Sequence, residues 1–192
     1  MKDTREPSIY IFNCYPKQSR ENFDRQDVGH PHDMYHGFLS RYVPKAQVKI
    51  LFIADFETDL PGPDELAGLD GIIWTGSDLT IYHLDDPRVT RQIELMQSIF
   101  EVGIPCYGSC WGIQMAAVAA GGEVKKNPNG REWGVSGIIS QTDSGHNSDL
   151  LRGKPKQYKG FVMHLDEVTG LPDGASLLAC NDHTHVQALE VK

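Results

Sequence analysis

The stretch Gly108-Ser109-Cys110-Trp111-Gly112 decides the fold, because it places a cysteine between two glycines. The short apolar run 104–107 precedes it, and the alanine-rich stretch 113–120 follows it. This order predicts a strand, a sharp turn and a helix, with the thiol at the apex of the turn. The glycines two residues before and two residues after the cysteine leave room for a tight, strained turn.

A turn of this kind raises a nucleophile above the edge of a sheet and points it at the first turn of a helix. The helix end contributes partial positive charge and backbone N–H groups that have no helical partner. We therefore expect a reactive thiol at Cys110 and an oxyanion-stabilising N–H at Trp111. The alternative interpretation is a small, buried, unreactive cysteine beside a glycine-rich turn.

Strand and helix patterns alternate through the first two-thirds of the chain. Strands are predicted at 8–12, 48–53, 71–74 and 104–107, and helices at 34–42, 65–66, 87–102 and 113–120. This alternation favours an α/β fold with a mostly parallel central sheet, helices on both faces and flavodoxin-like winding. The last third has little predicted helix, and its strands at 135–140, 160–164, 177–180 and 186–191 are expected to extend one edge. We expect a single domain over 1–192.

Two helices have apolar residues at helical spacing, which predicts their buried faces. For the predicted helix 87–102, Asp86 and Pro87 are favourable residues at the start and Gly103 is a favourable residue at the end. The polar segment 18–36 is interpreted as an excursion or a frayed helix. The predicted buried faces consist of Met34, Phe38, Leu39 and Tyr42 in the first helix, and Val89, Ile93, Met96 and Phe100 in the second.

The loop Thr75-Gly76-Ser77 directly follows the predicted strand 71–74. Because ligands bind at the carboxyl edge of a parallel sheet, this loop and Cys110 are expected to be neighbours. The N–H groups of Gly76 and Trp111 would then form an oxyanion hole with two donors. Removal of one such donor typically costs about 3–4 kcal/mol of barrier. The alternative is an ordinary turn that ends a strand.

Composition excludes several classes of function. The formal net charge of −8 makes a nucleic-acid backbone an unfavourable partner. The charged N-terminal residues do not form a signal peptide, and no apolar run is long enough to span a membrane. The four cysteines have neither a metal-binding pairing nor the density of a disulfide scaffold, which indicates a cytoplasmic protein with reduced thiols.

The eight histidines suggest a metal site, but their pattern argues against one. His32 and His36 are four residues apart in a polar segment, whereas zinc needs three or four ligands in fixed geometry. A solvated histidine-rich loop is the preferred interpretation, and no metal is expected. Cys106 is predicted to be a buried core thiol. His183 and His185 alternate on one face of a predicted strand and are weak candidates for a general base.

The chain resembles the class I glutamine amidotransferases, and most of all the glutaminase domains of GMP synthases. The segment 108–114 resembles the nucleophile motif of the family, including the glutamine at Gln114 that contacts the substrate. The segment 75–78 corresponds to the oxyanion loop, although it lacks the usual proline. Three further parts of the chain resemble family motifs in the same order: 121–134, 163–175 and 181–189.

The resemblance implies hydrolysis of the side-chain amide of L-glutamine. Cys110 would form a γ-glutamyl thioester, and the N–H groups of Gly76 and Trp111 would hold the oxyanion. The glutamine would be held by Gln114 and by the segment Met163-His164-Leu165, where the ring of His164 has either a substrate-binding or a structural role. No cofactor is implied. The ammonia would serve a separate synthase partner, because no phosphate-binding glycine-rich loop is present.

The main departure from the family is a missing His-Pro-Glu motif, which supplies the general base and its orienting acid. The sequence ends at Lys192, inside a predicted strand and before any such motif. We expect a chain truncated at its C-terminus. Two alternatives stay open: a stand-alone γ-glutamyl hydrolase, and a glutamine-binding relative without catalytic activity.

Overall fold

The computed structural model describes residues 5–192, which fall into two compact units. Unit 1 contains the residues up to Gly112, and unit 2 contains Ile113–Lys192. The boundary lies within helix α5 (Trp111–Ala119), directly after its second residue. The single amidotransferase-like domain expected over 1–192 stays a prediction.

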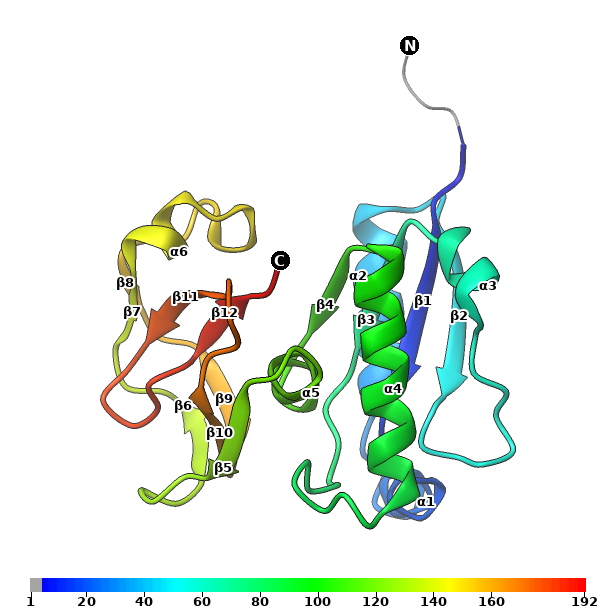
Figure 1. Ribbon diagram of the computed structural model, residues 1–192, viewed down its shortest axis with the longest axis horizontal. Helices are drawn as coiled ribbons and strands as arrows, with labels where there is room; N and C mark the ends of the chain where they lie inside the picture. The colour runs from blue at the N-terminus through cyan, green and yellow to red at the C-terminus, as the bar shows by residue number, and fades with distance from the viewer. Residues whose placement is uncertain (1–4) are drawn as a thin grey trace. The chain divides into compact units, whose positions relative to one another are not determined.

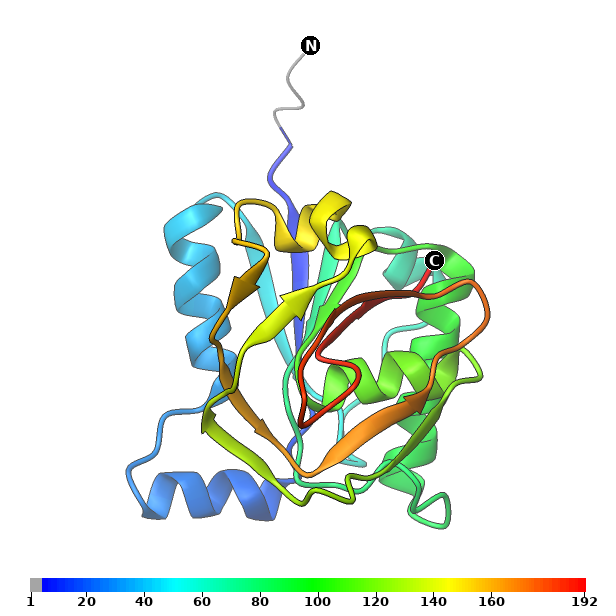
Figure 2. The same ribbon diagram turned by 90° about the vertical axis from the view of Figure 1, so that its left-hand side faces the viewer.

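Unit 1 is a four-stranded parallel sheet with the strand order β2-β1-β3-β4 (Figure 1). Helices α2 and α4 lie on opposite faces of this sheet (Figure 2). The α/β fold with a parallel sheet covered on both faces is therefore confirmed. The elements are β1 (Ser8–Asn13), α1 (Lys17–Arg25), α2 (Pro31–Tyr42), β2 (Gln47–Phe52), α3 (Pro63–Ala67), β3 (Gly71–Trp74), α4 (Pro87–Val102) and β4 (Cys106–Gly108).

Helix α4 has the predicted capping residues at both ends. The side chain of Asp86 accepts a hydrogen bond from the N–H of Arg88 at 2.9 Å, and Pro87 occupies the first turn. Gly103 ends the helix in the left-handed conformation, with φ of 79°. Two of the predicted core residues are buried and two are half-buried, because the buried stripe is rotated toward Val89, Gln92, Leu95, Met96 and Ile99.

The polar segment 18–36 is largely helical, so of the two predicted forms the helix agrees with the structure and the excursion does not, and the solvated histidine-rich loop is wrong. It forms α1 and the start of α2, and His32 is buried. The Nδ1 atom of His32 lies 2.6 Å from Nδ2 of the Asn13 side chain, and both residues are buried. The imidazole of His32 therefore belongs to the core of unit 1. The predicted apolar face of α2 is also wrong in part. Leu39 is buried, whereas three of its expected partners are exposed: Met34, Phe38 and Tyr42.

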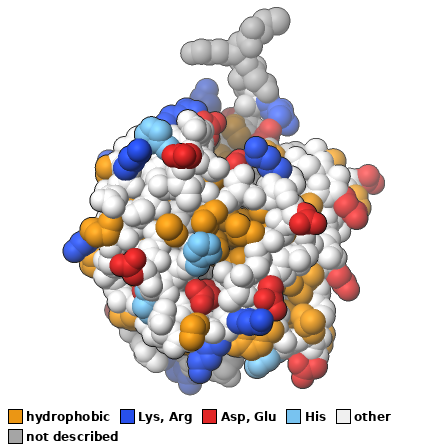
Figure 3. Space-filling view, turned by 60° about the vertical axis from the view of Figure 1, so that its left-hand side comes forward, with side chains coloured by type: hydrophobic (Ala, Val, Ile, Leu, Met, Phe, Trp, Pro, Cys, Tyr) orange, Lys and Arg blue, Asp and Glu red, His pale blue; other side chains and the backbone are white. Residues whose placement is uncertain are grey.

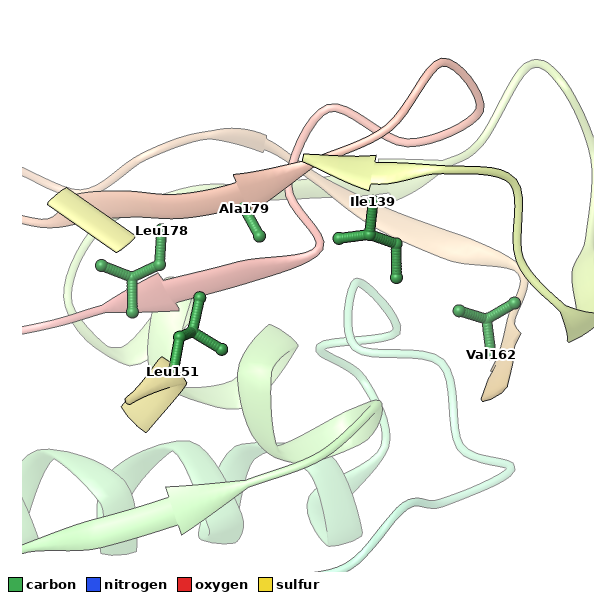
Figure 4. Close-up of a cluster of buried hydrophobic side chains, with 5 residues drawn as sticks. All are labelled: Ile139, Leu151, Val162, Leu178 and Ala179. Carbon is green, nitrogen blue, oxygen red and sulfur yellow. The ribbon is translucent and has the colours of Figure 1, made fainter. Parts of the chain in front are cut away.

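Unit 2 contains short antiparallel sheets around a small core. The sheet orders are β10-β5, β12-β11-β7-β8 and β6-β9. Five buried side chains form the core shown in Figure 4: Ile139, Leu151, Val162, Leu178 and Ala179. The elements after α5 are β5 (Glu123–Lys126), β6 (Glu132–Val135), β7 (Ile139–Gln141), α6 (Asp143–Asn147), a 3-10 helix (Asp149–Leu151), β8 (Gln157–Tyr158), β9 (Phe161–His164), β10 (Asp166–Gly170), β11 (Ser176–Cys180) and β12 (Ala188–Glu190).

The strand expected over 135–140 is two strands, because Ser136-Gly137-Ile138 separates β6 from β7. At this break the N–H of Ser136 donates to the carbonyl of Gly160 at 2.9 Å.

Figure 3 shows acidic and basic side chains interspersed with exposed hydrophobic ones on the face that it draws. Over residues 5–192, no helix combines the length and apolar character needed to cross a membrane.

Candidate functional site

The turn between β4 and α5 places strain on the cysteine itself. Strand β4 ends at Gly108, helix α5 begins at Trp111, and Cys110 between them has φ of 53°. This left-handed conformation costs a residue with a Cβ of the order of 1–2 kcal/mol. The side chain of Cys110 is half-buried. The strand-turn-helix arrangement predicted from the sequence is therefore present, with the thiol at its apex.

The two glycines around Cys110 are required by space rather than by backbone torsion. A Cβ on Gly108 would lie 2.7 Å from both Cα and C of Gly112. A Cβ on Gly112 would in turn lie 3.0 Å from the Cβ of Trp74 on β3. The start of α5 thus lies in direct backbone contact with β4 and β3. A side chain at either glycine position would push the turn away from the sheet.

We expect Gly108→Ala to lower both stability and activity. The clash involves backbone atoms that cannot rotate away, and overpacking of this kind costs about 1–3 kcal/mol. A displacement of about 1 Å at a reacting group costs up to about 100-fold in rate. Urea unfolding and amide hydrolysis assays measure the two effects. The matched control is Gly37→Ala in α2, where nothing lies within 4 Å of the new Cβ. Wild-type behaviour of Gly108→Ala would contradict the close approach.

Trp111 fixes the first turn of α5 to α4. Its indole Nε1 donates to Oε1 of Gln92 at 2.9 Å, and both side chains are buried. As the first residue of α5, Trp111 has a backbone N–H with no carbonyl of the same helix to bind. This N–H is therefore suited to a negatively charged oxygen beside Cys110.

The structure brings Gly76 next to Cys110, as expected for two loops at the carboxyl edge of the sheet. The point that a Cβ of Gly76 would occupy lies 3.7 Å from Cβ and 3.9 Å from Sγ of Cys110. Over residues 5–192, no backbone carbonyl accepts a hydrogen bond from the N–H of Gly76. The loop is held by the N–H of Thr75, which donates to the carbonyl of Phe12 at 3.0 Å.

The loop after β1 also reaches this edge, which the sequence patterns did not indicate. The N–H of Cys14 donates to Oγ1 of Thr75 at 3.0 Å, and Oγ of Ser77 donates to the carbonyl of Cys14 at 2.8 Å. Burial raises the pKa of the Cys14 thiol, so it stays protonated. The next residue, Tyr15, lies beside Gly76, with its hydroxyl 3.2 Å from the same Cβ point. The sequence did contain one signal for this neighbourhood, because the loops that follow parallel strands lie at the same edge of a sheet.

A second tyrosine contacts the turn through the residue before the cysteine. The hydroxyl oxygen of Tyr35, on α2, lies 2.7 Å from Oγ of Ser109. Burial raises the pKa of Tyr35 to about 12, although the hydrogen bond with Ser109 acts to lower it. The phenol is therefore protonated at neutral pH.

The prediction for Cys106 is wrong. This residue was expected to be buried, but it is exposed on the edge strand β4.

In unit 2, two of the four predicted glutamine-binding residues contact the same carbonyl oxygen. The amide Nε2 of Gln114 donates to the carbonyl of Asp166 at 3.2 Å, and Nδ1 of His164 lies 3.1 Å from the same oxygen. The carbonyl of Leu165 accepts a hydrogen bond from the N–H of Asn127 at 3.0 Å. The side chain of Met163 is exposed. Their role in substrate binding stays a prediction.

The other ring nitrogen of His164 contacts a buried carboxylate. Nε2 of His164 lies 3.1 Å from Oε2 of Glu132, whose carboxylate also accepts hydrogen bonds from Asn181 and Gln187 at 2.6 Å each. We call these four residues the Glu132 cluster. Because both ring nitrogens of His164 contact protein oxygens, its structural role is favoured. No sequence pattern singled out Glu132, although it lies in one of the motifs that carry the resemblance.

The remaining candidate residues have other partners. Nδ1 of His183 lies 3.2 Å from Oγ1 of Thr184 and 3.8 Å from Oε2 of Glu132. His30 contacts Asp24 at 2.8 Å. In the part of the chain that the structure describes, no group of three or more His, Cys, Asp or Glu side chains is placed to hold a metal ion.

The chain matches one known protein family over most of its length. Residues 33–192 match the family model of the class I glutamine amidotransferases. The chain belongs to the class I glutamine amidotransferase family. The family membership supports an enzyme of this class.

Two kinds of curated relatives are similar to the chain, a hydrolase and a group of synthases. A gamma-glutamyl-L-1-hydroxyisopropylamide hydrolase from Pseudomonas sp is 36% identical over 190 residues, which cover 96% of this chain and 62% of the relative. A glutamine-hydrolyzing GMP synthase from Leifsonia xyli subsp. xyli is 37% identical over 119 residues, which cover 62% of this chain and 22% of the synthase. The chain thus spans less than two thirds of the length of either relative.

Solved structures show the same fold at lower sequence identity. A glutamine amidotransferase from Thermotoga maritima has a TM-score of 0.71 and 17% identity, over 97% of this chain and 72% of the other. A glutamine amidotransferase from Methylobacillus flagellatus has a TM-score of 0.67 and 18% identity, over 98% of this chain and 66% of the other. These likenesses support the amidotransferase fold of the chain.

Proposed function

We propose that this amidotransferase hydrolyses the side-chain amide of L-glutamine with Cys110 as nucleophile. The observation that carries the proposal is the left-handed turn at Cys110, which lies next to Gly76 and directly before the first N–H of α5. The N–H groups of Gly76 and Trp111 are the proposed oxyanion donors. Gln114 and the segment Met163–Leu165 are the proposed glutamine-binding residues, within one domain over 1–192.

The chemistry takes place in two steps. Sγ of Cys110 attacks the amide carbon, the C–N bond breaks, and ammonia leaves with the proton that the thiol gives up. A γ-glutamyl thioester remains. Water then adds to the thioester carbonyl, the C–S bond breaks, and glutamate leaves as the thiol is restored. In this proposal the ammonia passes to a separate synthase partner, and no cofactor takes part.

A second candidate, a stand-alone γ-glutamyl amide hydrolase, is favoured by one observation. The relative that matches 96% of this chain is named as a hydrolase of a γ-glutamyl alkylamide. The same nucleophile and oxyanion donors serve both reactions, because only the leaving nitrogen differs. The two candidates therefore differ in substrate and in the need for a partner, and they share the chemistry at Cys110.

The test compares glutamine with γ-glutamyl-1-hydroxyisopropylamide as substrates of the protein. Release of glutamate and ammonia from glutamine, with little turnover of the alkylamide, is the expected result. Faster turnover of the alkylamide would replace the first candidate by the second. Labelling by an electrophilic glutamine analogue, mapped by peptide mass spectrometry, is expected at Cys110. A protein that neither turns over these amides nor takes the label at Cys110 would overturn both candidates.

A further inference from the structure

Tyr15 lies beside the proposed nucleophile in a position that the sequence motifs do not assign. Its hydroxyl oxygen is the atom nearest to the vacant Cβ position of Gly76, at 3.2 Å. The next two atoms are Cβ and Sγ of Cys110, at 3.7 Å and 3.9 Å. The hydroxyl of Tyr15 and the thiol of Cys110 therefore lie next to the same position, which is empty because Gly76 has no side chain.

The backbone of Tyr15 is held in place from both sides. Its N–H donates to Oδ1 of Asn13 at 3.0 Å, and its carbonyl accepts from Nη1 of Arg20 at 2.6 Å. Arg20 is itself fixed by a largely buried ion pair with Asp55 at 2.6 Å. The ring packs edge-on against Phe23, with the centroids 5.0 Å apart. The hydroxyl thus has a defined position at the carboxyl edge of the sheet.

The hydroxyl of Tyr15 is a proton donor at neutral pH. Burial, followed by the proximity of Cys110 and Asp78, raises the pKa of Tyr15 to about 12. Over residues 5–192, no group accepts a hydrogen bond from this hydroxyl. Tyr35 differs in this respect, because its hydroxyl is bonded to Ser109. A protonated donor without a protein acceptor is available for an oxygen of the substrate.

We propose that the hydroxyl of Tyr15 is a third oxyanion donor, which binds the carbonyl oxygen of the amide that Cys110 attacks. The inference rests on the proposed function, because it needs Cys110 to be the nucleophile. The hydroxyl keeps its proton throughout, so it supplements the N–H groups of Gly76 and Trp111 and does not act as a base. A donor placed before the reaction stabilises the charge that develops on this oxygen.

The test is Tyr15→Phe, which removes the hydroxyl and keeps the ring that packs against Phe23. We expect kcat for amide hydrolysis to fall about 100-fold, with KM changed less than about threefold, because the contact strengthens in the transition state. The thermal unfolding midpoint is expected to stay at the wild-type value. A KM effect with unchanged kcat would contradict an oxyanion role.

The matched control is Tyr35→Phe, which removes a similar half-buried hydroxyl near Cys110 that is bonded to Ser109. Its kcat is expected to fall much less than that of Tyr15→Phe. Equal losses in both variants would indicate general loosening of the turn and would overturn the inference. An active wild type with unchanged activity in Tyr15→Phe would overturn this inference alone. A wild type without activity and without labelling at Cys110 would overturn the proposed function and this inference with it.

Discussion

Cys110→Ala is expected to abolish hydrolysis of glutamine and of γ-glutamyl amides. Loss of a covalent nucleophile lowers kcat by about three orders of magnitude or more. Without the thiol no thioester can form, and the oxyanion donors alone do not replace it. Glutamate release at saturating substrate measures the loss. The control is Cys106→Ala on β4, which removes the neighbouring exposed thiol and is expected to retain wild-type turnover. Turnover within tenfold of wild type in Cys110→Ala would contradict the proposed mechanism.

The strain at Cys110 adds a second, independent expectation. The residue adopts φ of 53°, which glycine tolerates and alanine does not. Cys110→Gly is therefore expected to be more stable than Cys110→Ala by about 1 kcal/mol, although both variants lack the nucleophile. Urea unfolding of the two variants measures the difference. Equal stabilities would show that the turn relaxes when the thiol is removed.

Glu132→Gln is expected to destabilise unit 2 strongly. The carboxylate is buried and accepts hydrogen bonds from Asn181 and Gln187, and it contacts His164. An amide at this position would present N–H groups to these donors and remove the charge opposite the imidazole. Each hydrogen bond to a charged group is worth about 1.5–3 kcal/mol, so a loss of this order or larger is expected. The free energy of unfolding in urea at pH 7 measures the effect.

The same carboxylate gives unit 2 a defined dependence on pH. Burial acts to raise the pKa of Glu132, but the hydrogen bonds from Asn181 and Gln187 and the neighbouring His164 outweigh it and lower the pKa. A lowered pKa in the folded state stabilises the fold above the unfolded value of about 4.3. This contribution is lost as the pH falls through the folded value. The wild type should therefore lose stability below about pH 4, and Glu132→Gln should lose less of it over that range.

The control for both measurements is Glu190→Gln, because that glutamate is exposed on β12. It is expected to keep the stability and the acid response of the wild type. An equal change in the two variants would show that the acid response comes from net charge. A wild-type response in Glu132→Gln would contradict the arrangement of the Glu132 cluster.

Local signals explain what the sequence predicted correctly. The strands near 48–53 and 71–74, the first turn of α4 and the turn at Cys110 each depend on residues within a few positions of one another. The neighbourhood of Gly76 and Cys110 followed from one topological rule about parallel sheets. These features need no knowledge of how distant segments pack.

Distant contacts explain what the sequence did not predict. His32 is buried against the side chain of Asn13, which lies 19 positions earlier in the sequence. The polar residues around His32 do not indicate this contact. Glu132 lies in a short strand with an ordinary charged residue pattern, and its donors come from segments about fifty positions later. Tyr15 lies beside Gly76 because hydrogen bonds of Cys14 with Thr75 and Ser77 join the loop after β1 to the loop after β3.

The contacts around the turn limit how far it can be transplanted. The five residues 108–112 carry the motif, but Gly112 rests on Trp74, Ser109 is bonded to Tyr35, and the indole of Trp111 is bonded to Gln92. Grafting the pentapeptide onto another parallel sheet would therefore transfer the thiol without its geometry. The smallest transferable unit includes side chains from α2, β3 and α4, so a designer who seeks a reactive cysteine has to copy a constellation of distant residues.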